Sequence, residues 1–321
     1  MALSDDQNIK YEEEFIVNQR ETKLFTCKWI PVNQEPKALV FICHGYGMEC
    51  SISMRGTGTQ LAKAGFEVHG MDYEGHGKSS GLQGYIPNFD NIVDDCSNYF
   101  ISICERSENK KKKRFLLGES MGGAVALLLH RKEPYFWNGV VLVAPMCKIS
   151  EEIKPHPIIV NFLGKLANII PTWRITPTQE LLDVAFKNPK FRNEVRNNPY
   201  CYKGRPRLKS ALELLRVSLD IEKNLDKVSL PFLIVHGEDD KVTDPSTSKL
   251  LYESASSKDK TLKLYPGMWH ALTSGEPPEN INLVFSDIVS WLDDRAINVS
   301  NTDLETKQKS KNDKQFSLSQ D

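Results

Sequence analysis

Gly118-Glu119-Ser120-Met121-Gly122-Gly123 decides the fold, because this stretch holds the pattern G-x-S-x-G between a strand-like and a helix-like run. Residues 114–117, mostly apolar, precede it, and residues 124–130, rich in Ala and Leu, follow it. A strand, a tight turn and a helix in this order are the context of a nucleophile elbow. Glycines beside such a strained serine avoid collision with the adjacent strand and helix. The Ser120 hydroxyl is therefore predicted to project at a helix amino end; the alternative is a turn whose serine only caps the helix.

A serine hydroxyl is a poor nucleophile unless a base takes its proton, so a histidine is required. In this type of fold the chain order is serine, then an acid, then histidine. Three of the seven histidines precede Ser120, His130 lies within or just after the helix expected to follow it, and His156 falls in a proline-rich block. His236 precedes the acidic cluster. His270, on a loop between the last strand and the last helix, is therefore the predicted general base.

The acid that orients His270 is expected just after the strand candidate that ends at His236. Four carboxylates lie in residues 237–245. Asp240 is the predicted acid, whose task is to hold one imidazole tautomer and stabilise the imidazolium. Asp239 and Asp244 are the alternatives, and Asp244, directly before a proline, equally suits the cap of the next helix.

Acyl transfer also needs donors for a tetrahedral oxyanion. The backbone N–H of Met121, directly after the serine, is the first predicted donor. The strand candidate 38–43 runs into His44-Gly45-Tyr46-Gly47, which makes the N–H of Tyr46 the predicted second donor. The alternative is that this segment is only a tight turn. His44 is expected to brace the loop.

Short apolar runs alternate with helix-like stretches, which predicts the α/β class with a mostly parallel central sheet flanked by helices. Each run is nearly continuous in apolar residues, as strands buried on both faces must be. The strand candidates are residues 38–43, 66–72, 114–118, 139–143, 231–236 and 261–265. The predicted division is an N-terminal extension (1–24), a catalytic core (25–145 and 231–297), an inserted helical cap (146–230) and a disordered polar tail (298–321).

One stretch of the predicted cap is unusually apolar. Residues 158–170 carry Asn161, Lys165 and Asn168 on one stripe of a helix, and apolar side chains fill most of the rest. So wide an apolar arc must be covered. It packs on the protein itself, contacts substrate as a lid, or makes peripheral contact with a membrane.

Composition removes several classes of function. The chain has 321 residues, 40% of them hydrophobic and 26% charged, as in soluble globular proteins. A formal net charge of −1 gives no field that attracts nucleic acid. Acidic residues stand where a signal peptide needs a basic start, and no run reaches the ~18 apolar residues of a membrane span. The predicted location is cytoplasmic, with no nucleic-acid partner.

Cysteine usage agrees with that location. The seven cysteines include no C-x-x-C pair, which indicates free thiols in a reducing compartment. No Cys and His spacing is typical of a zinc site, so neither a metal nor another cofactor is expected. The basic run 110–114 directly precedes a strand candidate and is interpreted as a solvated loop.

These residues resemble a known family. The chain is similar to the monoacylglycerol lipase group of α/β-hydrolases, of the serine aminopeptidase S33 type, and most to its plant branch, which includes caffeoylshikimate esterases. The resemblance spans roughly residues 25–294. It is carried by His44-Gly-Tyr-Gly, Met71-Asp-Tyr-Glu-Gly-His-Gly-Lys-Ser, Gly118-Glu-Ser-Met-Gly-Gly, His236-Gly-Glu-Asp-Asp and Tyr265-Pro-Gly-Met-Trp-His.

The resemblance implies an α/β-hydrolase fold with Ser120 as nucleophile, Asp240 as acid, His270 as base, and Tyr46 and Met121 as oxyanion donors. It implies a serine esterase acting on a monoacylglycerol-like ester of a single acyl chain. The alternatives are a caffeoylshikimate esterase, an acyltransferase, and a small-molecule receptor on the same fold. One departure is a proline at position 266, where the family commonly has an acidic residue.

Overall fold

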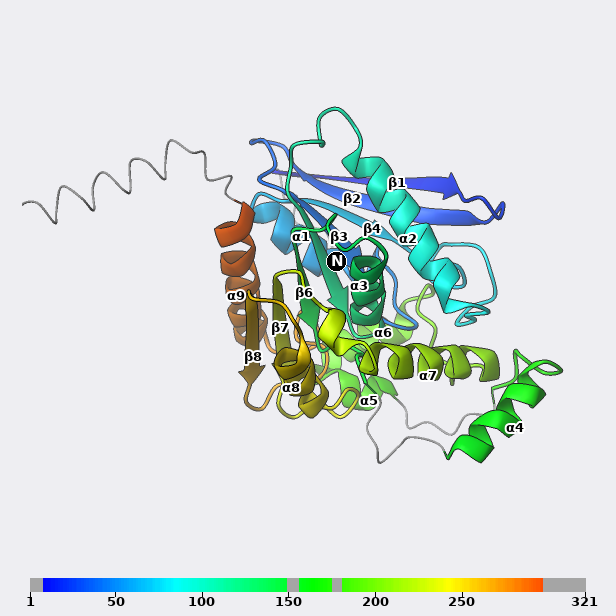
Figure 1. The fold of residues 1–321 in the computed structure, drawn as a ribbon. Coiled ribbons are helices and arrows are strands. Elements are labelled where there is room, and N and C mark those ends of the chain that lie inside the picture. The colour runs from blue at the N-terminus through cyan, green and yellow to red at the C-terminus, as the bar shows by residue number, and fades with distance from the viewer. Residues whose placement is uncertain (1–7, 149–155, 175–180, 297–321) are drawn as a thin grey trace, which may run out of the picture.

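An eight-stranded sheet forms the centre of the molecule (Figure 1). The computed structural model describes residues 8–148, 156–174 and 181–296. The sheet order is β1-β2-β4-β3-β5-β6-β7-β8; β3 to β8 are parallel, and β1 and β2 are antiparallel to their neighbours. The strands are β1 (Ile9–Val17), β2 (Lys23–Pro31), β3 (Leu39–Cys43), β4 (Glu67–Met71), β5 (Arg114–Glu119), β6 (Gly139–Val143), β7 (Phe232–Gly237) and β8 (Lys260–Tyr265).

All six predicted strands are present, whereas β1 and β2 were not anticipated. The sequence predicts residues 1–24 as an N-terminal extension, but residues 9–17 pair with β2 as the edge strand of the sheet. The sequence pattern used to predict strands detects only strands that are buried on both faces, and β1 is not one of them. β1 carries Glu12, Glu13 and Glu14 and is partly exposed along its length, so it lacks the apolar run that marks a buried strand.

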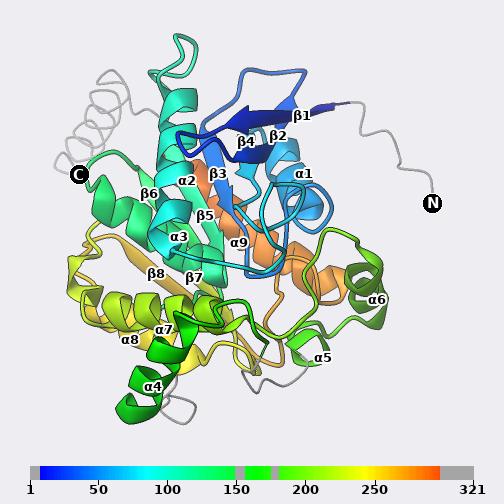
Figure 2. The same ribbon diagram turned by 90° about the vertical axis from the view of Figure 1, so that its right-hand side faces the viewer.

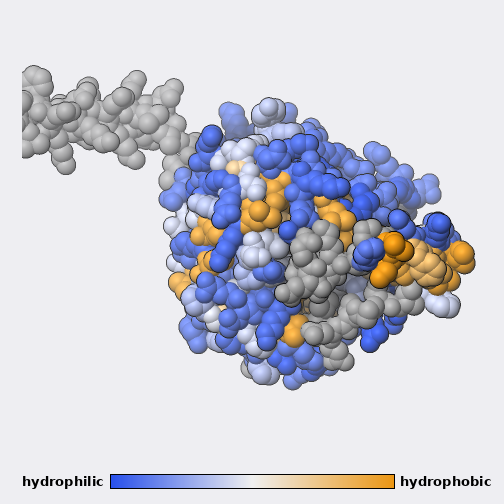
Figure 3. Space-filling model, turned by 60° about the horizontal axis from the view of Figure 1, so that its bottom comes forward, coloured by the Kyte–Doolittle hydropathy of each residue, from blue (hydrophilic) through white to orange (hydrophobic). Residues whose placement is uncertain are grey.

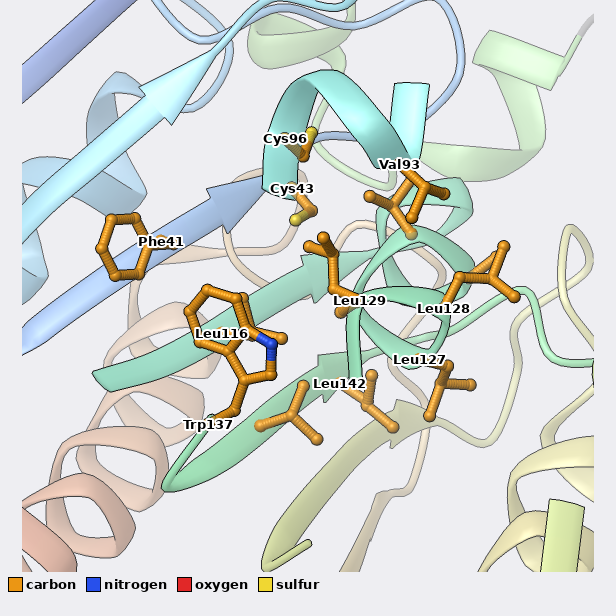
Figure 4. Close-up of a cluster of buried hydrophobic side chains, with 14 of the residues drawn as sticks. Phe41, Cys43, Val93, Cys96, Leu116, Leu127, Leu128, Leu129, Trp137 and Leu142 are labelled. Atoms are coloured by element: carbon orange, nitrogen blue, oxygen red, sulfur yellow. The ribbon is translucent and has the colours of Figure 1, made fainter. Parts of the chain in front are cut away.

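Helices cover both faces of the sheet, and alternate residues of each strand feed two separate cores. Leu39, Phe41 and Cys43 of β3 belong to one core, and Val40 and Ile42 belong to the other. Figure 4 shows part of the first core, where strand side chains meet leucines of α3. The first core includes α2 (Phe89–Cys104), α3 (Met121–Lys132) and α8 (Pro245–Ser254), and the second includes α1 (Arg55–Lys63) and α9 (Pro278–Ala296).

Between β6 and β7 the described residues form helices and no strand, as expected of the inserted block. Figures 1 and 2 place them beyond the carboxyl ends of the parallel strands. Val217 and Ile221, in the last of these α-helices, belong to the first core, so this helix packs against the same core as the sheet. The helices are α4 (Pro157–Ala167), α5 (Leu181–Ala185), α6 (Pro189–Asn197), α7 (Leu208–Glu222) and a 3₁₀ turn at Leu225–Lys227.

The apolar stretch predicted in the cap is α4 and the turn after it. α4 packs on α7 but leaves much of its apolar surface uncovered: Ile158 is 71% exposed and Phe162 64% exposed. Figure 3 shows the resulting hydrophobic patch. Within the described ranges, no helix has the length and apolarity needed to cross a membrane. The predicted polar tail, residues 298–321, lies outside the described residues.

Candidate active site

Ser120 stands at the junction of β5 and α3 in the strained turn that the sequence predicts. Its φ is 56°, a left-handed conformation that is rare outside glycine. The Ser120 N–H donates to the carbonyl oxygen of Val143 in β6 (3.0 Å), and its own carbonyl accepts from the N–H of Met146 (2.9 Å). A Cβ added at Gly122 would overlap the carbonyl oxygen of Cys43. The neighbouring strands therefore hold the turn and leave no room for a side chain at position 122.

The loop after β8 brings His270 to the predicted acid. The Nδ1 atom of His270 lies 2.7 Å from Oδ2 of Asp240, in the loop after β7. The other acids point elsewhere: Asp239 is exposed, and Asp244 accepts from the N–H of Ser246 (2.8 Å) as the N-cap of α8. Among the candidates that the sequence left open, Asp240 is thus the partner of His270.

Asp240 is buried and surrounded by donors. Its Oδ1 accepts from the N–H groups of Val242 (2.7 Å) and Thr243 (3.1 Å), while Oδ2 also accepts from the Thr243 hydroxyl (2.9 Å) and His236 Nε2 (3.0 Å). Burial alone would raise the pKa of Asp240, but the adjacent His270 and His236 outweigh it and hold that pKa well below its usual range. The carboxylate therefore stays ionised beside the imidazole.

Two buried residues around the site were not assigned a role from the sequence. His236 is fully buried; its Nε2 faces Asp240, and its Nδ1 lies 2.7 Å from the Ser248 hydroxyl. The sequence feature that could have indicated this contact is the position of His236 at the end of a strand candidate, four residues before Asp240. Glu119, next to Ser120, is also buried and accepts from the Thr273 hydroxyl (3.1 Å), three residues after His270. Burial raises the pKa of Glu119.

The loop after β3 runs beside the serine, as predicted for an oxyanion loop. A Cβ added at Gly45 would lie 3.4 Å from Cβ of Ser120. This places the backbone next to Tyr46 near the Ser120 side chain, and Met121, directly after the serine, is the first residue of α3. The Tyr46 hydroxyl donates to the carbonyl oxygen of Gly84 (2.7 Å).

His44, at the start of this loop, is fully buried and stacks on Tyr73, with ring centroids 3.9 Å apart. Burial lowers the pKa of His44 to about 3, so the ring stays neutral at physiological pH. Its Nδ1 lies 2.9 Å from the carbonyl oxygen of Gly45. These contacts agree with a bracing role.

No cluster of three or more His, Cys, Asp or Glu side chains within the described ranges is arranged to hold a metal ion. The reactive groups of the site are side chains and backbone groups of the protein. They are a serine in a strained turn, an imidazole held by an ionised carboxylate, and backbone N–H groups beside the serine. This is the chemistry of nucleophilic acyl transfer.

Residues 34–278 match the family described as serine aminopeptidase, S33. The chain belongs to this family. The match covers both parts of the sheet that contribute Ser120, Asp240 and His270 as well as the helical block between them.

Several relatives of this S33 family member are named as esterases or lipases. It is 37% identical over 275 residues to caffeoylshikimate esterase of Arabidopsis thaliana, covering 85% of this chain and 83% of the relative. It is 31% identical over 292 residues to monoglyceride lipase of Homo sapiens, covering 90% and 93%. A monoglyceride lipase structure from Saccharomyces cerevisiae superposes with a TM-score of 0.78 at 22% identity, covering 89% and 96%. The fold is therefore that of α/β-hydrolases.

The ionised state of Asp240 has a consequence for stability. Its pKa is lower in the folded chain than in the unfolded one, so the stabilisation is present above about pH 4, the unfolded value, and is lost at lower pH. We expect Asp240→Asn to reduce the unfolding free energy by about 2 kcal/mol at pH 7, with the difference narrowing below about pH 4. Urea unfolding at several pH values measures it. Asp239→Asn, at an exposed position, is the control; a difference for D240N that does not change with pH would contradict the network.

Proposed function

We propose that the protein is a serine carboxylic-ester hydrolase in which Ser120, His270 and Asp240 act as nucleophile, general base and acid. The observation that carries the proposal is the 2.7 Å contact between His270 Nδ1 and the ionised Asp240, at the sheet edge where the Ser120 elbow projects. The contact leaves Nε2 of His270 as the ring atom that can accept the serine proton.

In the proposed reaction the Ser120 Oγ attacks the ester carbonyl carbon while His270 Nε2 takes its proton. The N–H groups of Tyr46 and Met121 donate to the resulting oxyanion. The tetrahedral intermediate expels the alcohol, which receives the proton from His270, and an acyl-enzyme remains. Water then gives a proton to the same histidine and attacks the acyl carbonyl carbon. The carboxylic acid product is released, and the serine oxygen takes the proton back from His270. Asp240 stays ionised throughout and stabilises the imidazolium.

The proposed substrate is a monoacylglycerol or a similar ester of one acyl chain. Monoglyceride lipases are among the relatives that align over most of this chain. The exposed apolar side chains of α4 add a physical reason, because a lipid ester is presented at an apolar surface.

A second candidate is a hydroxycinnamoyl ester such as caffeoylshikimate, favoured by the 37% identity to the Arabidopsis esterase. Transfer of the acyl group to another alcohol would use the same residues.

Removal of the nucleophile tests the mechanism. We expect Ser120→Ala to lower turnover of a short p-nitrophenyl ester by at least about 10³-fold, because the acyl-enzyme cannot form, with little change in melting temperature. Undiminished hydrolysis by the variant would exclude the serine mechanism. Negligible turnover by the wild type, together with tight binding of a small ligand, would instead support a receptor.

Substrate identity requires a direct comparison. We expect kcat/KM to be higher for a monoacylglycerol than for caffeoylshikimate, because a long apolar acyl chain buries more area. Purified protein should be assayed on both, with Ser120→Ala as the blank for each. A higher value on caffeoylshikimate would select the second candidate.

We propose that the protein is cytoplasmic and contacts membranes peripherally through α4. The support is the run of exposed apolar side chains at Ile158, Ile159 and Phe162, with Ile169 and Trp173 just beyond the helix. We expect the wild type to float with neutral phosphatidylcholine liposomes and an Ile159→Ser, Phe162→Ser double variant to stay in the soluble fraction. Equal recovery of both proteins with and without lipid would refute the contact.

A further inference from the structure

We propose that Asn198, in the helical block between β6 and β7, is a positioning residue that fixes the oxyanion loop beside Ser120. The oxyanion loop is defined as residues 44–53 and carries the Tyr46 N–H. The inference rests on the proposed function, because it assigns Asn198 an effect on the oxyanion donor. It follows from a buried hydrogen-bonded junction between two segments that are far apart in the chain.

The centre of this junction is the carboxylate of Glu49, which has no exposed surface. It accepts from the N–H groups of Ile52 (3.1 Å) and Ser53 (2.7 Å) and from the Ser51 hydroxyl (2.6 Å). Burial opposes ionisation, but these donors and the Asn198 side chain outweigh it and lower the pKa of Glu49. An ionised carboxylate thus folds the second half of the oxyanion loop around itself.

Asn198 supplies the donor from outside the loop. Its Nδ2 lies 2.9 Å from Oε1 of Glu49 and 3.4 Å from Oγ of Ser53, and the side chain is almost fully buried. The residue is itself held: its N–H donates to the carbonyl oxygen of Glu194 in α6, and its Oδ1 accepts from the N–H of Tyr200 (2.9 Å). The end of α6 therefore presents a fixed amide to the loop.

Backbone contacts bring the same segment to the residue next to the proposed donor. The Tyr202 N–H donates to the carbonyl oxygen of Gly47 (2.8 Å), and a Cβ added at Gly47 would lie 2.7 Å from the Tyr202 carbonyl oxygen. Cys201 Sγ lies 3.2 Å from Ser53 Oγ. The Tyr46 N–H thus lies in a stretch of backbone that residues 198–202 hold from one side.

The geometry predicts what loss of the amide does. A small displacement of the loop moves the Tyr46 N–H relative to the oxyanion but leaves Ser120, His270 and Asp240 in place. Such a change weakens binding of the transition state more than that of the ground state, so kcat falls while KM changes little. Removing a donor completely costs about 10² to 10³ in rate, and a displacement costs less.

Asn198→Asp is the sharpest test, because it keeps the shape of the side chain and places a second carboxylate against Glu49. At pH 8 we expect kcat on a short p-nitrophenyl ester to fall about 10- to 100-fold with KM within about twofold. Inhibition by an alkyl trifluoromethyl ketone, which forms a hemiketal oxyanion on the serine, should weaken in proportion to kcat/KM. Asn197→Asp, the same charge change at the exposed neighbouring position, should leave all three quantities unchanged.

Asn198→Ala removes the donor without adding charge and should change the same quantities in the same direction but by less. It decides the question if N198D does not fold, as judged by circular dichroism. The proposal is overturned if the folded variants match N197D in kcat, or if kcat falls without weaker ketone inhibition. Undiminished turnover by the Ser120→Ala variant, or a wild type that the ketone does not inhibit, would instead refute the proposed function.

Discussion

The turn between β5 and α3 places a strained serine where a side chain at Gly118, Gly122 or Gly123 would collide with neighbouring atoms, and the rest of the site depends on this constraint. A non-glycine residue at positive φ costs about 1–3 kcal/mol, so surrounding structure must hold it. Here β6 and the segment directly after it do so, because the N–H of Ser120 donates to the carbonyl oxygen of Val143 and the N–H of Met146 donates to the carbonyl oxygen of Ser120. Strand pairing that stabilises the core also aims the hydroxyl. Stability and function are thus linked through one turn.

A second constraint is the charge of Asp240. A carboxylate taken out of water is unstable unless donors replace its hydration. The loop after β7 supplies them from its own backbone and from Thr243, and His236 adds one from the end of the strand. With the ionised state secured in this way, the remaining hydrogen bond can hold His270 in one tautomer and orientation. The Asp240 carboxylate is therefore held by its own loop as well as by its contact with His270.

The helical block has two different relations to the sheet. α7 shares the first core, and residues 198–202 form hydrogen bonds with the loop after β3, so these parts are packed continuously with the sheet. α4 contacts α7 but exposes large apolar side chains. A helix such as α4, which packs on α7 and exposes apolar side chains, suits an ester presented by lipid.

The sequence by itself determined the parallel strands and the serine elbow, because both are local: a buried strand needs a continuous apolar run, and a strained turn needs glycines. β1 escaped this reasoning because an edge strand with exposed glutamates carries no such run. The sequence favoured Asp240 among the clustered acids but left Asp239 and Asp244 open; only the tertiary structure decided that Asp240 reaches His270. Likewise, Asn198 meets Glu49 across 149 residues. Contacts between distant segments depend on how the chain folds back, which no local pattern encodes.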